Sequence, residues 1–192
     1  MFPHFLVPPG HYQVRLTAAG QTRTQPFTIV RNPLGAATDA DLQEQFRLAK
    51  QINDRVTSAN EAVLRVRSIK EQLGNRLTKV NDARLKATGD TLTTKLTDIE
   101  GEIYQYRNRS NQDPLNFPIR LNNKLAALQS IVENGDYKPT DQSYAVFKEL
   151  AAELEKQLGR VDAVIETDVD AFNKQIVKKK LEPIRTEVPA PQ

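Results

Sequence analysis

The sequence predicts a mainly α-helical protein, an antiparallel up-and-down four-helix bundle with long helices, preceded by an N-terminal β-hairpin. Three observations support this fold class. Apolar and polar residues alternate with period two over residues 10–30, which is typical of strands. From residue 39 onward the apolar residues recur every three or four positions, which is typical of helices. Short segments rich in Pro, Gly and Asn divide this second region into four helical stretches, so the helices are expected to fold back on one another.

The first 33 residues indicate a hairpin with one apolar face. Tyr12, Val14 and Leu16 share one face of the first strand, and a glycine-containing turn follows them. Phe27 and Ile29 share a face of the second strand. An isolated two-stranded hairpin is only marginally stable in water. The hairpin must therefore pack on the helices, pair with another chain, or form the last two strands of a β-sandwich, and we favour the last interpretation.

Two long helical segments follow the hairpin. Thr38 is a good N-cap, and the apolar stripe that begins at Leu42 continues without Pro or Gly until Gly74. This predicts a first helix over residues 39–73, about 50 Å long. A second helix is expected to start between residues 77 and 83 and to carry its stripe as far as Tyr106.

The second half of the chain predicts a short helix and another long one. Pro118 is expected in the first turn of the third helix, after a loop over residues 109–117 that covers the point where the bundle thins to three helices or two. Thr140 is expected to cap a fourth helix that extends through Ile176. The proline-rich end should be disordered or extended. The sequence therefore predicts three parts, which are a hairpin over 1–33, a helical bundle over 34–182 and a disordered tail over 183–192.

Composition excludes several classes of site. The 192 residues contain no Cys and two His, His4 and His11, which removes thiol nucleophiles, disulfides, Cys-type zinc sites and most His-dependent sites. The net charge of +3 is small for this length and argues against a nucleic-acid partner. No stretch is apolar and long enough to span a membrane. We therefore expect no cofactor, no metal centre, no nucleic-acid partner and no membrane span.

The loop after the second helix holds the candidate interaction residues, which are Tyr104, Arg107, Arg109, Asn111 and Asp113. Aromatic and basic side chains in this order could form a platform for sugars or single-stranded nucleic acid. The structural alternative, which we favour, is a helix end at which the arginines bond to terminal carbonyl groups and the Asn and Asp side chains order the loop.

Two further features permit other functions. Asp162, Glu166 and Asp170 are spaced to share one helix face, and a hydrolytic site there would need inward-facing carboxyl groups with raised pKa values. A solvent-exposed face is the alternative that we favour. The stripe of Val, Ala and Leu could also pair two chains as a coiled coil, so a homodimer is possible, but the capped loops favour folding within one chain.

Three parts of the sequence carry a family resemblance. They are Val7-Pro8-Pro9-Gly10 with Gln25-Pro26-Phe27, then Tyr106-Arg107-Asn108-Arg109 with Asp113-Pro114-Leu115-Asn116, and finally Pro139-Thr140-Asp141-Gln142. Together they resemble the C-terminal region of large exported bacterial proteins with a sortilin-like or BNR (Asp-box) β-propeller, which are often labelled glycosyl hydrolases. The resemblance implies that the hairpin is the end of an Ig-like or fibronectin-like sandwich that precedes the helical bundle. This chain contains no Trp and no Asp-box, so the resemblance carries no catalytic residue over to it.

The resemblance and the exclusions together predict a non-catalytic accessory module. The resemblance implies a periplasmic or extracellular protein that docks onto its parent propeller or onto a protein partner. This hypothesis predicts exposed apolar residues near the hairpin. A carbohydrate-active or hydrolytic unit and a cytoplasmic coiled-coil adaptor are the alternatives.

Overall fold

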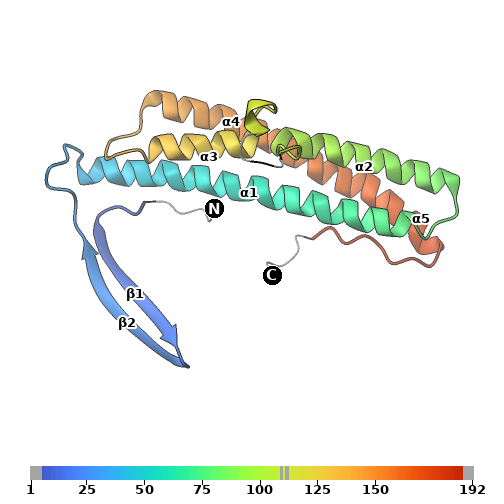
Figure 1. The fold of residues 1–192 in the computed structure, drawn as a ribbon, viewed down its shortest axis with the longest axis horizontal. Coiled ribbons are helices and arrows are strands. Elements are labelled where there is room, and N and C mark those ends of the chain that lie inside the picture. The colour runs from blue at the N-terminus through green and yellow to red at the C-terminus, as the bar shows by residue number, and fades with distance from the viewer. Residues whose placement is uncertain (1–5, 109, 111–112, 188–192) are drawn as a thin grey trace.

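The computed structural model describes residues 6–108, 110 and 113–187 and is mainly helical. Its elements are β1 (Gly10–Ala18), β2 (Gln21–Ile29), α1 (Asp39–Leu77), α2 (Ala83–Ile103), the short 3-10 turn η1 (Asp113–Leu115), α3 (Leu121–Val132) and α4 (Asp141–Val164). A π turn, η2 (Ile165–Val169), then joins α4 to α5 (Asp170–Lys178). This confirms the prediction of a helical bundle preceded by a β-hairpin (Figure 1).

The two long helices run parallel to each other. Arg55 of α1 pairs with Glu155 of α4 at 3.0 Å, and Arg65 pairs with Asp162 at 2.8 Å, so residue numbers rise together along both helices. α4, η2 and α5 form one continuous rod beside α1 (Figure 1).

The third side of the bundle is made by α2 and α3, which lie end to end (Figure 1). α3 ends beside the start of α1, where Gln45 donates to the carbonyl of Val132 at 2.8 Å. α2 lies beside the other half of α1, where Arg67 and Lys70 bind Glu100. The bundle is therefore three helices thick along its length, and the directions do not alternate over four helices. The described part of the loop after α2 lies at mid-length, where α2 and α3 meet, instead of covering a thinner end (Figure 1).

The helix boundaries follow the expected caps, with one correction. The Thr38 hydroxyl accepts from the N–H of Asp41, whose carboxylate accepts from the N–H of Thr38, a reciprocal capping box. Thr140 caps α4 as predicted. Pro118 does not lie in the first turn of α3, because that helix begins at Leu121.

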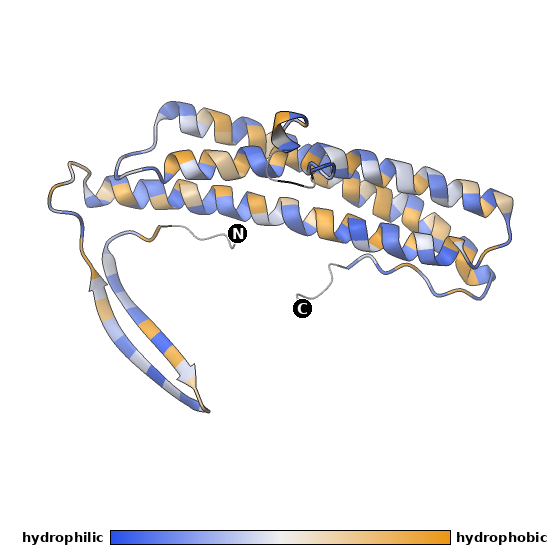
Figure 2. Ribbon diagram, in the orientation of Figure 1, coloured by the Kyte–Doolittle hydropathy of each residue, from blue (hydrophilic) through white to orange (hydrophobic). Residues whose placement is uncertain are grey.

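The core is a continuous apolar seam between the helices, visible as the inward orange bands in Figure 2. Its largest fully buried side chains are Leu48, Ile52, Ile69, Leu73, Leu92, Leu96, Ile99, Ile103, Leu121, Leu125, Leu154 and Phe172. Tyr106, expected to continue the stripe of α2, lies beyond the end of that helix and is 42% exposed.

Both ends of the chain depart from a simple bundle. The hairpin projects away from the start of α1, and only its base lies near the helices (Figure 1). Residues 183–187 of the proline-rich tail are extended, one of the two conformations expected for the tail, and they bond to α1 and α5. Residues 188–192 lie outside the described residues.

Candidate interaction site

The hairpin has a fixed register and a tight two-residue turn. Ala18 pairs with Gln21, and Ala19 and Gly20 between them have φ values of 48° and 75°. Two positive φ values at the turn define a type I′ geometry, whose twist matches that of the strands. The register places Tyr12 opposite Phe27, with ring centroids 5.8 Å apart.

One face of the hairpin carries apolar side chains that are open to solvent, and it also holds Gln25 and Arg23 of β2. Val14 is 54% exposed, Leu16 67% and Phe27 46%. Hydrophobic and hydrophilic bands alternate along β1 in Figure 2, as expected for a strand with one apolar face. The expectation of exposed apolar residues near the hairpin is confirmed. Such a face on a strand pair that covers nothing is typical of an interaction surface.

The two edges of the hairpin differ. Residues that flank a two-residue turn form a hydrogen-bonded pair, and such pairs alternate with non-bonded ones along the strands. The backbone groups of Gln13, Arg15 and Thr17 therefore point outward from the free edge of β1. Pro26 lies opposite Gln13 in a non-bonded pair, so its backbone nitrogen faces the outer edge of β2, and this nitrogen carries no hydrogen to donate. The edge of β1 thus offers an uninterrupted row of donors and acceptors, whereas the edge of β2 is blocked.

The entry into β1 is held by a side chain. The hydroxyl of Tyr12 donates to the carbonyl of Pro8 at 2.6 Å. A tyrosine near the start of a strand that bonds to backbone a few residues upstream is the tyrosine corner of immunoglobulin-type sandwiches. The same contact here fixes the direction in which residues 6–9 approach the strand.

A hollow of about 160 Å³ separates the base of the hairpin from the bundle. It is lined by apolar residues of both parts, including Val7, Ile29 and Leu42. On its rim, Arg31 donates to the carbonyl of Ala37 at 2.6 Å. These contacts tie the hairpin to the start of α1 at its base and leave the rest of it free.

Tyr104, the first of the five candidate residues in the loop after α2, packs against α1. The guanidinium of Arg67 lies 4.8 Å from the centroid of its ring. Arg67 also donates to Glu100 at 2.7 Å, and Lys70 donates to the same carboxylate at 2.9 Å. Glu100 is only 3% exposed, so Tyr104 belongs to an ionic cluster around a buried carboxylate that fastens α2 to α1.

The remaining candidates are not gathered into one site. Arg107 lies over the ring of Tyr106 at 5.9 Å and is exposed. The carboxylate of Asp113 accepts from the N–H and the hydroxyl of Ser110, both at 2.8 Å, which orders the loop as the structural alternative proposed. Arg109 and Asn111 lie outside the described residues. The structure thus separates Tyr104 from Arg107 and gives Asp113 a local role.

The carboxylates of the alternative hydrolytic site face outward. Asp162 pairs with Arg65 and Asp170 with Lys174, while Glu166 is exposed. No cluster of three potential metal ligands occurs among the described residues.

The carboxyl groups with shifted pKa values are helix caps. Hydrogen bonds from the hydroxyl and N–H of Thr38 lower the pKa of Asp41. The N–H of Leu85 and the ammonium of Lys179 lower the pKa of Asp82. Both shifts run opposite to the raised pKa that a general acid needs.

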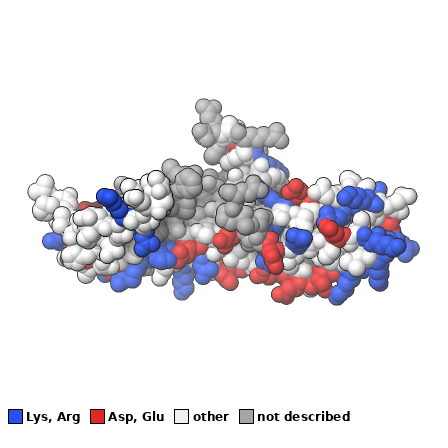
Figure 3. Space-filling model, turned by 90° about the horizontal axis from the view of Figure 1, so that it is seen from below, with Lys and Arg blue, Asp and Glu red and all other residues white. Residues whose placement is uncertain are grey.

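Charge on the bundle is mixed. Basic and acidic side chains are interspersed on the face shown in Figure 3, and basic ones gather at its right-hand end. At that end α5 terminates in Lys178, as expected for cations that oppose a helix dipole. Within the part of the chain that the structure describes, no helix is long and apolar enough to cross a membrane.

Comparison with known proteins gives no relative for this chain: no protein-family model, no curated protein and no solved structure matches it.

Proposed function

We propose that this chain is a non-catalytic interaction module in which the bundle is a rigid support and the hairpin docks onto a β-sheet of the parent protein. The observation that carries this proposal is the set of exposed apolar side chains on a hairpin that, beyond its base, covers nothing in its own chain. Full burial of a Val, Leu or Phe side chain contributes roughly 1.5–3 kcal/mol. Covering Val14, Leu16 and Phe27 would therefore stabilise a strand pair that is marginal alone.

The edge asymmetry supports strand addition at β1. A neighbouring strand can bond along Gln13, Arg15 and Thr17, whereas Pro26 suits β2 to the outer edge of a sheet. The bond from Tyr12 to Pro8 supports the interpretation of the hairpin as the last two strands of an immunoglobulin-like sandwich. The occupant of this surface would then be the sheet that such a sandwich still requires.

Charge favours a different sequence over a second copy as the occupant. The hairpin carries Arg15 and Arg23 and no acidic residue, so two hairpins would repel each other. A sheet with acidic side chains along the pairing edge fits better. An exported β-propeller protein as the parent, and a periplasmic or extracellular location, remain proposals that rest on the sequence resemblance alone.

The other functions find less support in the geometry. The outward, paired positions of Asp162 and Asp170 do not favour a hydrolytic site. The apolar seam that a coiled-coil adaptor would offer to a second chain is used within the bundle.

Site-specific photo-crosslinking in the source cells tests the proposal. A benzophenone amino acid placed at Leu16 should capture one partner, because this side chain would lie in the contact. The same group at Thr24, which is exposed on the opposite face and on the blocked strand, is the matched control. Mass spectrometry of the crosslink from Leu16 should identify a β-strand peptide, encoded in frame with this chain if the parent hypothesis holds.

Two results would contradict the proposal. Identical crosslinks from Leu16 and Thr24 would mean that the apolar face has no dedicated partner. A crosslink from Leu16 only to helical or non-protein material would mean that the surface does not bind a sheet.

A further inference from the structure

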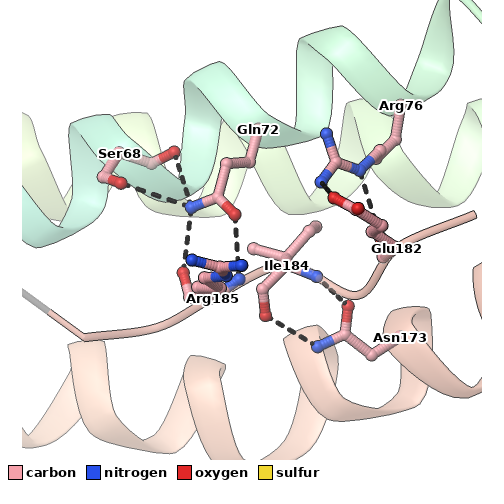
Figure 4. A network of polar contacts seen from close by, with 7 residues as sticks. All are labelled: Ser68, Gln72, Arg76, Asn173, Glu182, Ile184 and Arg185. Carbon is pink, nitrogen blue, oxygen red and sulfur yellow. Dashed lines mark hydrogen bonds and ion pairs between the residues drawn. The ribbon is translucent and has the colours of Figure 1, made fainter.

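The segment that follows α5 is bound through its main chain. Residues 181–187 run back along the groove between α1 and α5 (Figure 4). Gln72 of α1 accepts from the N–H of Arg185 at 2.9 Å and donates to its carbonyl at 3.0 Å. Asn173 of α5 does the same for Ile184, at 2.7 and 3.0 Å. Two amide side chains on facing helices thus bind both sides of an extended chain.

Two arginines of α1 extend this recognition. Arg65 donates to the carbonyl of Thr186 at 2.6 Å, and Arg76 donates to the carbonyl of Glu182 at 3.0 Å. Ile184 is 3% exposed and is the one buried side chain among the described residues of the segment. The groove therefore selects an extended backbone with one aliphatic anchor.

The turn that directs the segment into the groove is strained. At the end of α5 the N–H of Lys180 bonds to the carbonyl of Val177, and the N–H of Leu181 bonds to that of Ile176. This is the Schellman pattern, whose left-handed position usually holds glycine. Here it holds Lys180 at φ 62°, a conformation that is unfavourable for a residue with a Cβ.

We propose that two copies of this chain exchange the segment 181–187, each placing it in the α1–α5 groove of the other. The exchanged form keeps every contact of the groove, because an identical segment occupies it. It also releases the strain, because Lys180 can adopt a helical or extended backbone once the segment points outward. Exchange of this kind is favoured by a short strained hinge and by high protein concentration.

Substitutions at the hinge test this inference on the full chain. Lys180→Pro cannot adopt a positive φ, so the closed form is disfavoured and light scattering after size exclusion should show a dimer. Lys180→Gly removes the strain, which favours the closed monomer by roughly tenfold. The unsubstituted chain should lie between these two variants. Monomers for all three chains up to millimolar concentration would overturn the proposal.

A complementation experiment covers the case in which Lys180→Pro merely releases the segment. One variant carries Ile184→Asp, which spoils the segment and leaves the groove intact. The other carries Gln72→Ala and Asn173→Ala, which spoil the groove and leave the segment intact. Circular dichroism first establishes that both fold.

Mixing these two variants should give a one-to-one heterodimer through a single intact segment and a single intact groove, whereas each variant alone stays monomeric. Two folded variants that fail to associate would overturn the exchange. Neither experiment alters the hairpin, so the outcomes of both experiments are independent of the function proposed above.

Discussion

Replacing Glu100 by Gln should destabilise the bundle strongly, because this carboxylate is the centre of the ionic cluster between α1 and α2. It accepts from Arg67 and Lys70 while being only 3% exposed. The amide in Glu100→Gln has nearly the same shape but no charge. The substitution therefore removes the negative charge that neutralises Arg67 and Lys70 and leaves the packing unchanged.

The size of the expected loss in stability depends on how exposed the two cations that bind Glu100 are. Breaking a buried ion pair by removing one member costs roughly 3–5 kcal/mol. The side chains of Arg67 and Lys70 are 46% and 24% exposed, so both cations recover part of their hydration when the carboxylate is lost. We expect a loss of about 2–3 kcal/mol in the free energy of unfolding. For a chain of this length this lowers Tm by roughly 4–12 °C.

Urea unfolding followed by circular dichroism measures this loss. The matched control is Glu102→Gln on the same helix, where the carboxylate lies 3.5 Å from Arg120. The side chain of Glu102 is 45% exposed and that of Arg120 is 35% exposed. An exposed pair of this kind contributes less than about 1 kcal/mol. Equal losses for the two variants would refute the argument that burial of Glu100 sets the magnitude.

Three other predictions concern local structure. Gly159→Ala should stabilise the chain by about 1 kcal/mol, measured by urea unfolding, because an added Cβ meets nothing within 4 Å and Ala favours a helix. Gly89→Ala should lose that gain in the same assay, because its Cβ would lie 2.6 Å from a methyl carbon of Leu77. Hydrogen bonds from Thr38 lower the pKa of Asp41 below 3.8. The stabilisation that the ionised Asp41 gives to the folded chain is therefore present above that pH and disappears as the pH falls through the lowered pKa. Asp41→Asn should accordingly show a smaller acid-induced loss of stability than the unsubstituted chain, measured by urea unfolding at a series of pH values.

Local features of the bundle could be predicted from the sequence because they depend on near neighbours. The apolar spacing from Leu42 to Leu73 defined α1, and Thr38 and Thr140 defined two helix starts. The buried face of α3 also follows the expected spacing. A helix period and a cap are set by residues a few positions apart, so one sequence is sufficient to indicate them.

The arrangement of the helices could not be derived in this way. Whether α3 turns back on α2 or continues in line with it depends on the loop after residue 103, whose conformation is fixed by contacts between distant residues. One such contact is the bond from Gln105 to the carbonyl of Pro118 at 2.9 Å, and nothing in the local pattern indicates it. The end-to-end arrangement of α2 and α3 was therefore missed.

The binding residues of the tail groove were missed for a related reason. Gln72 and Asn173 lie on the polar side of amphipathic helices, where a sequence pattern indicates only solvent exposure. Their partners are backbone groups over ten residues away, which carry no sequence signal. In the hairpin, by contrast, Pro26 was a usable signal for the blocked edge, since proline in a strand indicates an outer position.

The π turn of residues 165–169 has a consequence for how this protein can change during evolution. A turn closed by bonds to the fifth residue holds one residue more than an α-helical turn, and here it lies between the buried side chains of Ile165 and Val169. Loss of Thr167, which is exposed, would leave an ordinary α-helix with Val161 and Phe172 still facing the core. Loss of Ala152 in α4 would instead rotate every later core residue by about 100°. This helix should thus accept a one-residue deletion at the π turn and reject one at Ala152, about three turns into α4, which a comparison of the melting temperatures of the two deletion variants can establish.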